Sequence, residues 1–152
     1  MIVDNTQIQD IDYILDNLSD KNIRELKIHF GENWKNYVKS EMLANLDKHS
    51  ITGKTDDNTP VIVTGILNDN GTSGWLYFLH TDEIANLPLF ELIKKSKKQV
   101  NKWMNDYDIL NACILNTNTE TIKWAELTGF KPVNIQGDFI VLTLEKEENY
   151  GK

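Results

Sequence analysis

His80 is the side chain of this 152-residue chain with the clearest capacity for proton transfer. An imidazole exchanges a proton near neutral pH, and His80 ends an apolar run, residues 75–80, that is typical of a strand. A histidine at a strand end beside a cleft could act as a general base. The alternative is a surface or structurally hydrogen-bonded histidine, because one histidine alone does not make a catalytic site. His80 is therefore the candidate base.

The only cysteine and the other histidines indicate less chemistry. Cys113 lies in an apolar run, residues 109–115, where we expect a small buried residue in place of a nucleophile. His29, His49 and His80 share no metal-ligand spacing with one another or with Cys113, so we expect no metal. A single cysteine also cannot form an internal disulfide, which favours a reducing cytoplasm.

Residues 116–132, NTNTETIKWAELTGFKP, predict a short capped helix that ends at Gly129. Asn118 or Thr119 can cap its first turn, and Phe130 completes its apolar face. An ordinary α/β protein could also end a helix with Gly and anchor the next strand with Phe. The order of the surrounding elements must decide between these two interpretations.

Hydrophobic periodicity predicts strands and helices along the whole chain. Thr6 with Gln9, and Asn22 with Glu25, have capping-box spacing and open two helices, the second of which Gly31 interrupts. The predicted strands cover residues 2–3, 50–54, 61–67, 75–80, 109–115, 133–135 and 139–144, and a further helix covers 88–107. That long helix makes a crossover between strands 75–80 and 109–115, which we therefore expect to be parallel.

Length and composition favour one domain over residues 1–145, with residues 146–152 as a frayed tail. The formal charge of −7 opposes sequence-independent binding to nucleic acid, and the apolar runs are too short to span a bilayer. Five lysines, Lys94, Lys95, Lys97, Lys98 and Lys102, share a helix whose other face is apolar. We interpret them as a solvated outer face.

The order of elements, together with Asn118 and the pair Gly129-Phe130, resembles the GNAT superfamily of N-acyltransferases over nearly the whole chain. This resemblance implies an α/β (α+β) fold with a mixed, mostly antiparallel sheet, a central parallel strand pair, and helices on both faces. It also implies acetyl-CoA in a gap between the two parallel strands. Asn118 would then face the pantetheine arm, and the backbone near Phe78 and Leu79 would bind the cofactor.

Two positions depart from the family pattern. The family places Arg or Gln and two small residues, Gly and then Gly or Ala, before its long helix, whereas residues 84–89 here read IANLPL. The stretch therefore lacks glycine and arginine, and Pro88 removes one backbone donor for a pyrophosphate. Many members also carry a tyrosine as general acid four residues before Gly-Phe, and Ala125 stands there, next to Trp124.

The resemblance implies acetyl transfer from acetyl-CoA to the amine of a small molecule or a protein, in a weak or degenerate form. The alternative is a non-catalytic interaction protein on the same fold. Among GNAT-like proteins, the chain looks most like the small acetyltransferase-like proteins of tailed phages, some of them internal virion components. That likeness implies a virion or host protein partner, in the host cytoplasm or the virion. A small-molecule sensor is a third possibility without positive support.

Overall fold

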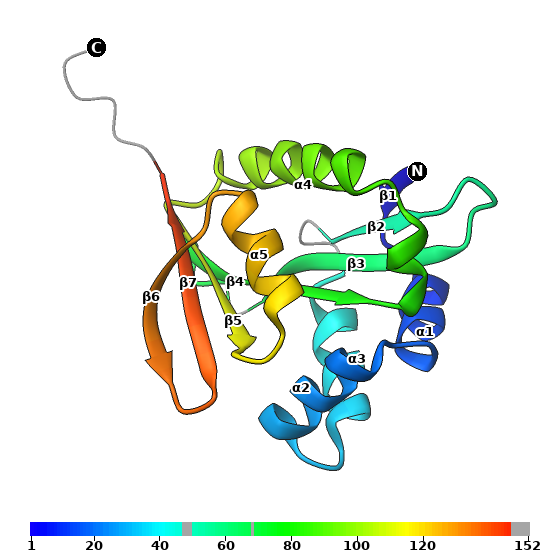
Figure 1. Ribbon diagram of the computed structural model, residues 1–152, viewed down its shortest axis with the longest axis horizontal. Helices are drawn as coiled ribbons and strands as arrows, with labels where there is room; N and C mark the ends of the chain where they lie inside the picture. Colours follow the sequence, from blue (N-terminus) through cyan, green and yellow to red (C-terminus); the bar gives the residue numbers. More distant parts are fainter. Residues whose placement is uncertain (47–49, 68, 147–152) are drawn as a thin grey trace. The chain divides into compact units, whose positions relative to one another are not determined.

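The computed structural model describes residues 1–46, 50–67 and 69–146, and it divides the chain into two compact units (Figure 1). The first unit comprises residues 1–67 and 77–92, and the second comprises residues 68–76 and 93–152. His49 and the tail beyond residue 146 lie outside the described residues. The single domain over residues 1–145 stays a prediction.

The elements follow the predicted order, with one added 3₁₀ helix. The strands are β1 (Ile2–Asn5), β2 (Ile51–Lys54), β3 (Pro60–Leu67), β4 (Ser73–His80), β5 (Ile109–Leu115), β6 (Lys131–Gln136) and β7 (Phe139–Glu145). The helices are α1 (Ile8–Asp16), α2 (Asp20–Phe30), α3 (Trp34–Ala44), α4 (Leu89–Trp103) and α5 (Thr119–Leu127), with the 3₁₀ helix η1 (Asp82–Asn86) between β4 and α4. None of the helices in these ranges is long and apolar enough to cross a membrane.

The strands of the described chain form one sheet in the order β1-β2-β3-β4-β5-β7-β6. β4 and β5 pair in parallel, through Ser73 with Ile109 and Trp75 with Asn111, which confirms the predicted parallel pair. The pairs β1–β2, β2–β3, β5–β7 and β6–β7 are antiparallel. The mixed, mostly antiparallel sheet expected from the sequence is therefore confirmed.

In the first unit, α1, α2 and α3 pack together beside β3 (Figure 1). Their shared core buries Ile11, Ile14 and Met42 against Val63 and Leu79 of the strands. A second apolar cluster joins Val61 and Ile62 of β3 to Leu87 and Leu92, with Phe78 packed against it. Phe78 and Leu79 are neighbours on β4 and enter different clusters, as the alternation of side chains along a strand requires.

The predicted caps of α1 and α2 are both wrong. Gln7, not Thr6, is the N-cap of α1, and its backbone N–H donates to Asp10 Oδ2 at 2.9 Å. Ser19 caps α2, and its Oγ accepts from the backbone N–H of Asn22 at 3.3 Å. Thr6 and Asn22 are both buried and hydrogen-bond to residues distant in sequence, which capping-box spacing cannot reveal. The predicted break at Gly31 is confirmed, since this residue ends α2 at φ 80°.

Thr6 belongs to a cluster of hydroxyl groups inside the first unit. Its Oγ1 accepts from Ser50 Oγ at 2.8 Å and from Thr52 Oγ1 at 3.0 Å, and Ser50 Oγ also lies 2.9 Å from Tyr77 Oη. Tyr77 crosses β3 at Gly65, where any Cβ would lie 2.7 Å from the phenol oxygen. Burial raises the pKa of Tyr77 to about 12, although the hydrogen bond with Ser50 opposes this shift.

In the second unit, α5 contacts β5, and the residues after it close the helix against the sheet. Phe130 is 2% exposed, and its backbone N–H donates to the carbonyl of Ala125 at 3.0 Å. Gly129 has φ 110°, and a Cβ there would lie 3.4 Å from Leu144 Cδ1 of β7. Gly129-Phe130 therefore ends the helix and anchors the next strand, as predicted.

Replacing Phe130 with alanine should lower the free energy of unfolding by roughly 3–5 kcal/mol, because it removes a fully buried aromatic ring. Chemical denaturation measures this loss. Leu127→Ala is the matched control at the last residue of α5, where the side chain is 44% exposed, and it should cost less than about 1 kcal/mol. Equal losses in the two variants would contradict the anchoring role of Phe130.

The buried hydroxyl of Tyr77 should make stability depend on alkaline pH. A phenol whose folded pKa exceeds its unfolded value stabilises the fold below the unfolded pKa, and this contribution is lost as pH rises through the folded pKa. Between about pH 10 and 12 the loss should reach about 2–3 kcal/mol, at roughly 1.4 kcal/mol per pKa unit. Urea unfolding across this range should show a steeper decline for the native chain than for Tyr77→Phe. Parallel declines would exclude Tyr77 as the group responsible.

Candidate functional site

The end of β4 holds three of the four residues predicted to form the site. Phe78 and His80 lie on one face of the strand, with ring centroids 5.8 Å apart, whereas Leu79 is buried in the core with α1, α2 and α3. The parallel pairs of β4 with β5 run from Ser73 to Trp75 and include none of the three. Leu79 can therefore contribute only its backbone to a binding site.

The backbone of His80 is held on both sides by the junction of α1 and α2. Its N–H donates to Asn22 Oδ1 at 2.8 Å, and its carbonyl accepts from the Ser19 N–H at 3.0 Å. Leu18 forms an antiparallel bridge with Thr81, whose own N–H donates to the carbonyl of Val61 at 2.9 Å. The amide of His80 is therefore already engaged and is not a donor for a developing oxyanion.

His80 is only 6% exposed, and its Nδ1 lies 3.1 Å from the carbonyl oxygen of Thr81. A carbonyl accepts, so this contact favours the tautomer that carries the proton on Nδ1. Nε2 is then the unprotonated nitrogen of this tautomer. The side chain is thus a structurally hydrogen-bonded histidine whose tautomer still suits a base.

Several backbone N–H groups of the segment between β4 and α4 donate hydrogen bonds within the segment itself. The N–H of Glu83 donates to Thr81 Oγ1 at 3.2 Å, and that of Ile84 to the Thr81 carbonyl at 3.3 Å. The N–H of Leu87 donates to the Ile84 carbonyl at 3.2 Å, and Pro88 has no N–H. These contacts close the segment as η1, where a pyrophosphate would need outward-facing amides.

The charges of the same segment oppose an anion as well. Asp82 and Glu83 are exposed carboxylates in η1, and Glu91 is acidic in the first turn of α4. No lysine or arginine occurs between residues 81 and 92. The segment therefore does not fit the pyrophosphate of acetyl-CoA, because it offers few donors and the wrong sign of charge.

The second unit holds the fourth predicted residue, Asn118. It is the N-cap residue of α5 and is 2% exposed; its carbonyl accepts from the Ile122 N–H at 3.2 Å, but its side chain makes no capping hydrogen bond. Ala125, the position at which the sequence resemblance would place a tyrosine, is 0% exposed. Trp124 is buried beside it and donates from Nε1 to Ser96 Oγ at 3.0 Å, so its side chain belongs to the core.

Two tyrosines elsewhere, the partly buried Tyr77 and the buried Tyr107, do not replace the missing acid. Tyr77 is tied into the hydroxyl cluster of the first unit. Tyr107 donates to Asp69 Oδ2 at 2.6 Å, and burial, followed by this carboxylate, raises its pKa strongly. A general acid must still carry its proton when the thiolate of CoA leaves, and a raised pKa keeps a tyrosine protonated. The hydroxyls of Tyr77 and Tyr107, however, already make structural hydrogen bonds.

The structure thus gathers Phe78, Leu79 and His80 on one strand of the first unit and places Asn118 in the second unit. Sequence patterns missed Ser19 and Asn22, which hold His80 from a distance of about sixty residues along the chain. No local signal reports such a contact. In the described ranges no three His, Cys, Asp or Glu side chains gather as metal ligands, and Cys113 is partly buried on β5.

Strand order, the parallel pair and the order of helices define the GNAT fold. Three solved structures with this fold are similar to the chain. The PaiA N-acetyltransferase of Thermoplasma acidophilum in complex with coenzyme A is 10% identical with a TM-score of 0.68, and the match covers 95% of this chain and 98% of that chain. The spermidine N-acetyltransferase of Vibrio cholerae in complex with CoA and spermine is 11% identical with a TM-score of 0.68, and the match covers 95% of this chain and 94% of that chain. A GNAT-family acetyltransferase of Bacillus anthracis is 12% identical with a TM-score of 0.64, and the match covers 96% of this chain and 95% of that chain.

At these identities the likeness establishes the fold alone. No family model matches the sequence, and no curated protein matches it either. The fold predicted from the order of elements is therefore confirmed, whereas the activity has to be argued from the residues themselves.

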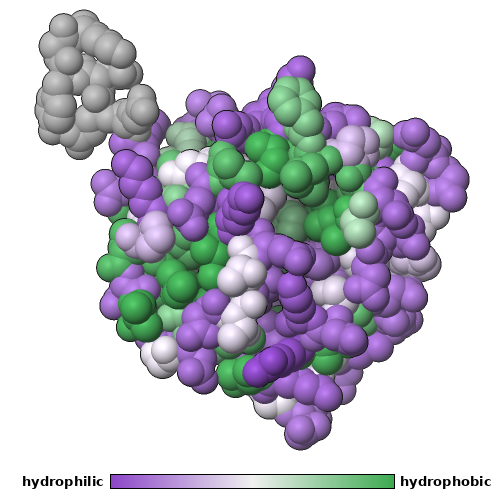
Figure 2. Space-filling model, viewed as in Figure 1, coloured by the Kyte–Doolittle hydropathy of each residue, from purple (hydrophilic) through white to green (hydrophobic). Residues whose placement is uncertain are grey.

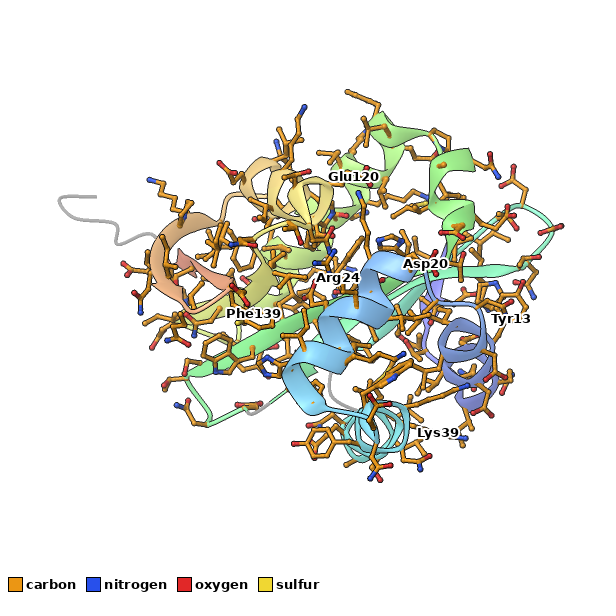
Figure 3. The ribbon with its side chains drawn as sticks, turned by 60° about the horizontal axis from the view of Figure 1, so that its bottom comes forward. Tyr13, Asp20, Arg24, Lys39, Glu120 and Phe139 are labelled. Atoms are coloured by element: carbon orange, nitrogen blue, oxygen red, sulfur yellow. The ribbon has the colours of Figure 1, made fainter. Side chains whose placement is uncertain are left out.

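Asn22→Ala should lower the free energy of unfolding by about 1–3 kcal/mol, because the buried N–H of His80 would lose its acceptor. Thermal or urea unfolding measures the change. Arg24→Ala is the control on the same helix, since Arg24 is exposed two positions further on (Figure 3) and its loss should stay within about 0.5 kcal/mol. If the two variants unfold alike, the contact between Asn22 and His80 contributes no net stability.

Proposed function

We propose that this protein is an acetyltransferase-like GNAT-fold protein in which transfer of acetyl from acetyl-CoA to an amine is weak or degenerate. The observation that carries the proposal is the closed, acidic segment between β4 and α4. A working cofactor site needs amides and positive charge where this chain has η1, Asp82 and Glu83. The fold and its neighbours support the acetyltransferase type, and this segment supports the degenerate form.

The residues left for chemistry are His80 and Asn118. His80 could accept a proton from an amine at Nε2, because the Thr81 carbonyl sets the tautomer. Phe78 and Leu79 would contribute backbone groups near it. In this proposal Asn118 is the residue that faces the pantetheine arm of the cofactor. Its buried position at the beginning of α5 supports this role.

The acceptor in this proposal is an amine on a small molecule or a protein. One structural neighbour is a spermidine N-acetyltransferase crystallised with spermine, which is a polycation. Residues 1–67 and 77–92 contain seven Lys and Arg against fourteen Asp and Glu, so a cationic amine would be attracted to this part of the chain. We place the protein in the cytoplasm, which the single cysteine supports.

The alternative is a non-catalytic protein that binds a virion or host partner. Loss of the glycines and of the tyrosine suits it, but the structural neighbours described above include no virion component. It therefore rests on the sequence resemblance alone, and calorimetry with CoA separates it from the first proposal. Micromolar affinity would support a cofactor site, whereas absence of heat and of thermal stabilisation at millimolar CoA would favour the non-catalytic role.

The purified protein should show no robust acetyl-CoA turnover against a panel of free amines that includes spermidine. Thiol release measures the rate, and turnover of about 1 s⁻¹ or faster, in the ordinary enzyme range, would contradict the proposal.

Ala125→Tyr should not restore activity, because the cofactor segment is deficient and a tyrosine would overpack a fully buried position. Asp82→Asn with Glu83→Gln should raise CoA affinity, and the exposed pair Asp106→Asn with Asp108→Asn is the charge-matched control.

A further inference from the structure

Helix α4 has one buried face and one strongly basic face. Val100 and Trp103 are 1% and 2% exposed, and they mark the side that packs on the protein. The exposed lysines on the other side are Lys94, Lys97, Lys98 and Lys102. At about 100° per residue these four fall within an arc of about 140°, and they extend over about 12 Å of helix. We call them the lysine face.

The charges of the lysine face are not compensated by neighbouring carboxylates. None of its four lysines forms an ion pair with any residue that the structure describes. Helix α3 differs, since Lys35 and Lys39 each lie 2.6 Å from an aspartate of α1; Figure 3 labels Lys39. The only acidic residue of α4, Glu91, lies in its first turn, 3.6 Å from the amine of Met1.

An exposed aromatic side chain stands at the beginning of the same face. Phe90 is 82% exposed, the largest exposure of any large hydrophobic residue in the described ranges, and its neighbour Leu89 is 68% exposed. α4 is one unbroken helix from Leu89 to Trp103, so Phe90 falls within the arc of the lysine face, one turn before Lys94. Figure 2 shows hydrophilic and hydrophobic side chains mixed along the upper margin, where α4 runs in Figure 1.

We propose that the lysine face of α4, with Phe90 at its beginning, docks on the surface of an anionic lipid bilayer. Lysines in a row attract acidic lipid headgroups without needing a fixed geometry, and an aromatic ring is favoured at the bilayer interface. Nucleic-acid recognition would favour the planar fork of arginine, but the chain's only arginine, Arg24, is on α2. Binding is reversible, because one aromatic side chain and a few lysines do not anchor a protein stably.

The net charge of −7 does not prevent such docking. At about 0.1 M salt, charges further than roughly 10 Å from the bilayer are largely screened, so the local charge of α4 decides the interaction. Residues 68–76 and 93–152 contain nine basic and nine acidic residues, and the excess of acid lies in the remainder of the chain. The proposal does not depend on acetyl transfer, and its test uses no acetyl-CoA.

The test is co-sedimentation of the full chain with phosphatidylcholine vesicles that contain or lack phosphatidylserine. The protein should bind only the anionic vesicles and should be released by salt. Lys94→Gln, Lys98→Gln and Lys102→Gln combined should lower partitioning by about 100-fold, at on the order of fivefold per lysine near the surface. The corresponding triple arginine variant should retain binding, and Phe90→Ser should weaken it about tenfold.

The charge-matched control removes three exposed lysines from other elements, Lys27, Lys123 and Lys131, each by replacement with glutamine. It should bind the vesicles almost as the native chain does, and circular dichroism checks that every variant is folded. Absence of binding to anionic vesicles at low salt would overturn the proposal. Equal loss in the control would do so too, as would binding to duplex DNA without binding to vesicles.

Discussion

The arrangement of the candidate site depends on two hydrogen bonds that hold the backbone of His80 at the end of β4. They come from Ser19 and Asn22, at the junction of α1 and α2. β4 belongs to both compact units, since residues 73–76 pair in one and residues 77–80 pack in the other. The junction therefore holds the end of β4 and occupies both the N–H and the carbonyl of His80. Because the N–H of His80 already donates to Asn22 Oδ1, it is not available to bind a substrate or an oxyanion.

In the segment that follows β4, too, backbone N–H groups are used by the fold and are not left for a ligand. A phosphate cradle requires consecutive amides that no carbonyl has taken, and glycines permit the backbone to present them. Here Thr81 starts a 3₁₀ turn that uses these amides internally, and Asp82 and Glu83 follow it. The turn is a stable local structure for a sequence without glycine. The turn stabilises the segment, but its internal hydrogen bonds use the N–H groups that a phosphate would need. The chain therefore combines an acetyltransferase-like fold with a segment poorly suited to bind the cofactor.

The hydroxyl cluster around Tyr77 shows how the first unit accommodates polar groups in its interior. Tyr77 of β4, Thr52 of β2, Ser50 just before β2, and Thr6 between β1 and α1 hydrogen-bond to one another through their hydroxyl groups, which reduces the cost of burying each group alone. Gly65 makes room for the phenol ring to cross β3. The cluster connects the β2 segment to Tyr77 of β4, the strand that ends at His80.

Local patterns in the sequence determined the order of strands and helices, the break at Gly31, the buried Phe130 and the absence of a glycine-rich loop. Each of these follows from neighbouring residues, because periodicity and turn chemistry act over a few positions. Only the tertiary structure decided the partners of Thr6, Asn22 and His80. Both predicted caps failed, since a buried polar side chain bonds to whatever the fold brings near it, and that partner can be anywhere in the chain.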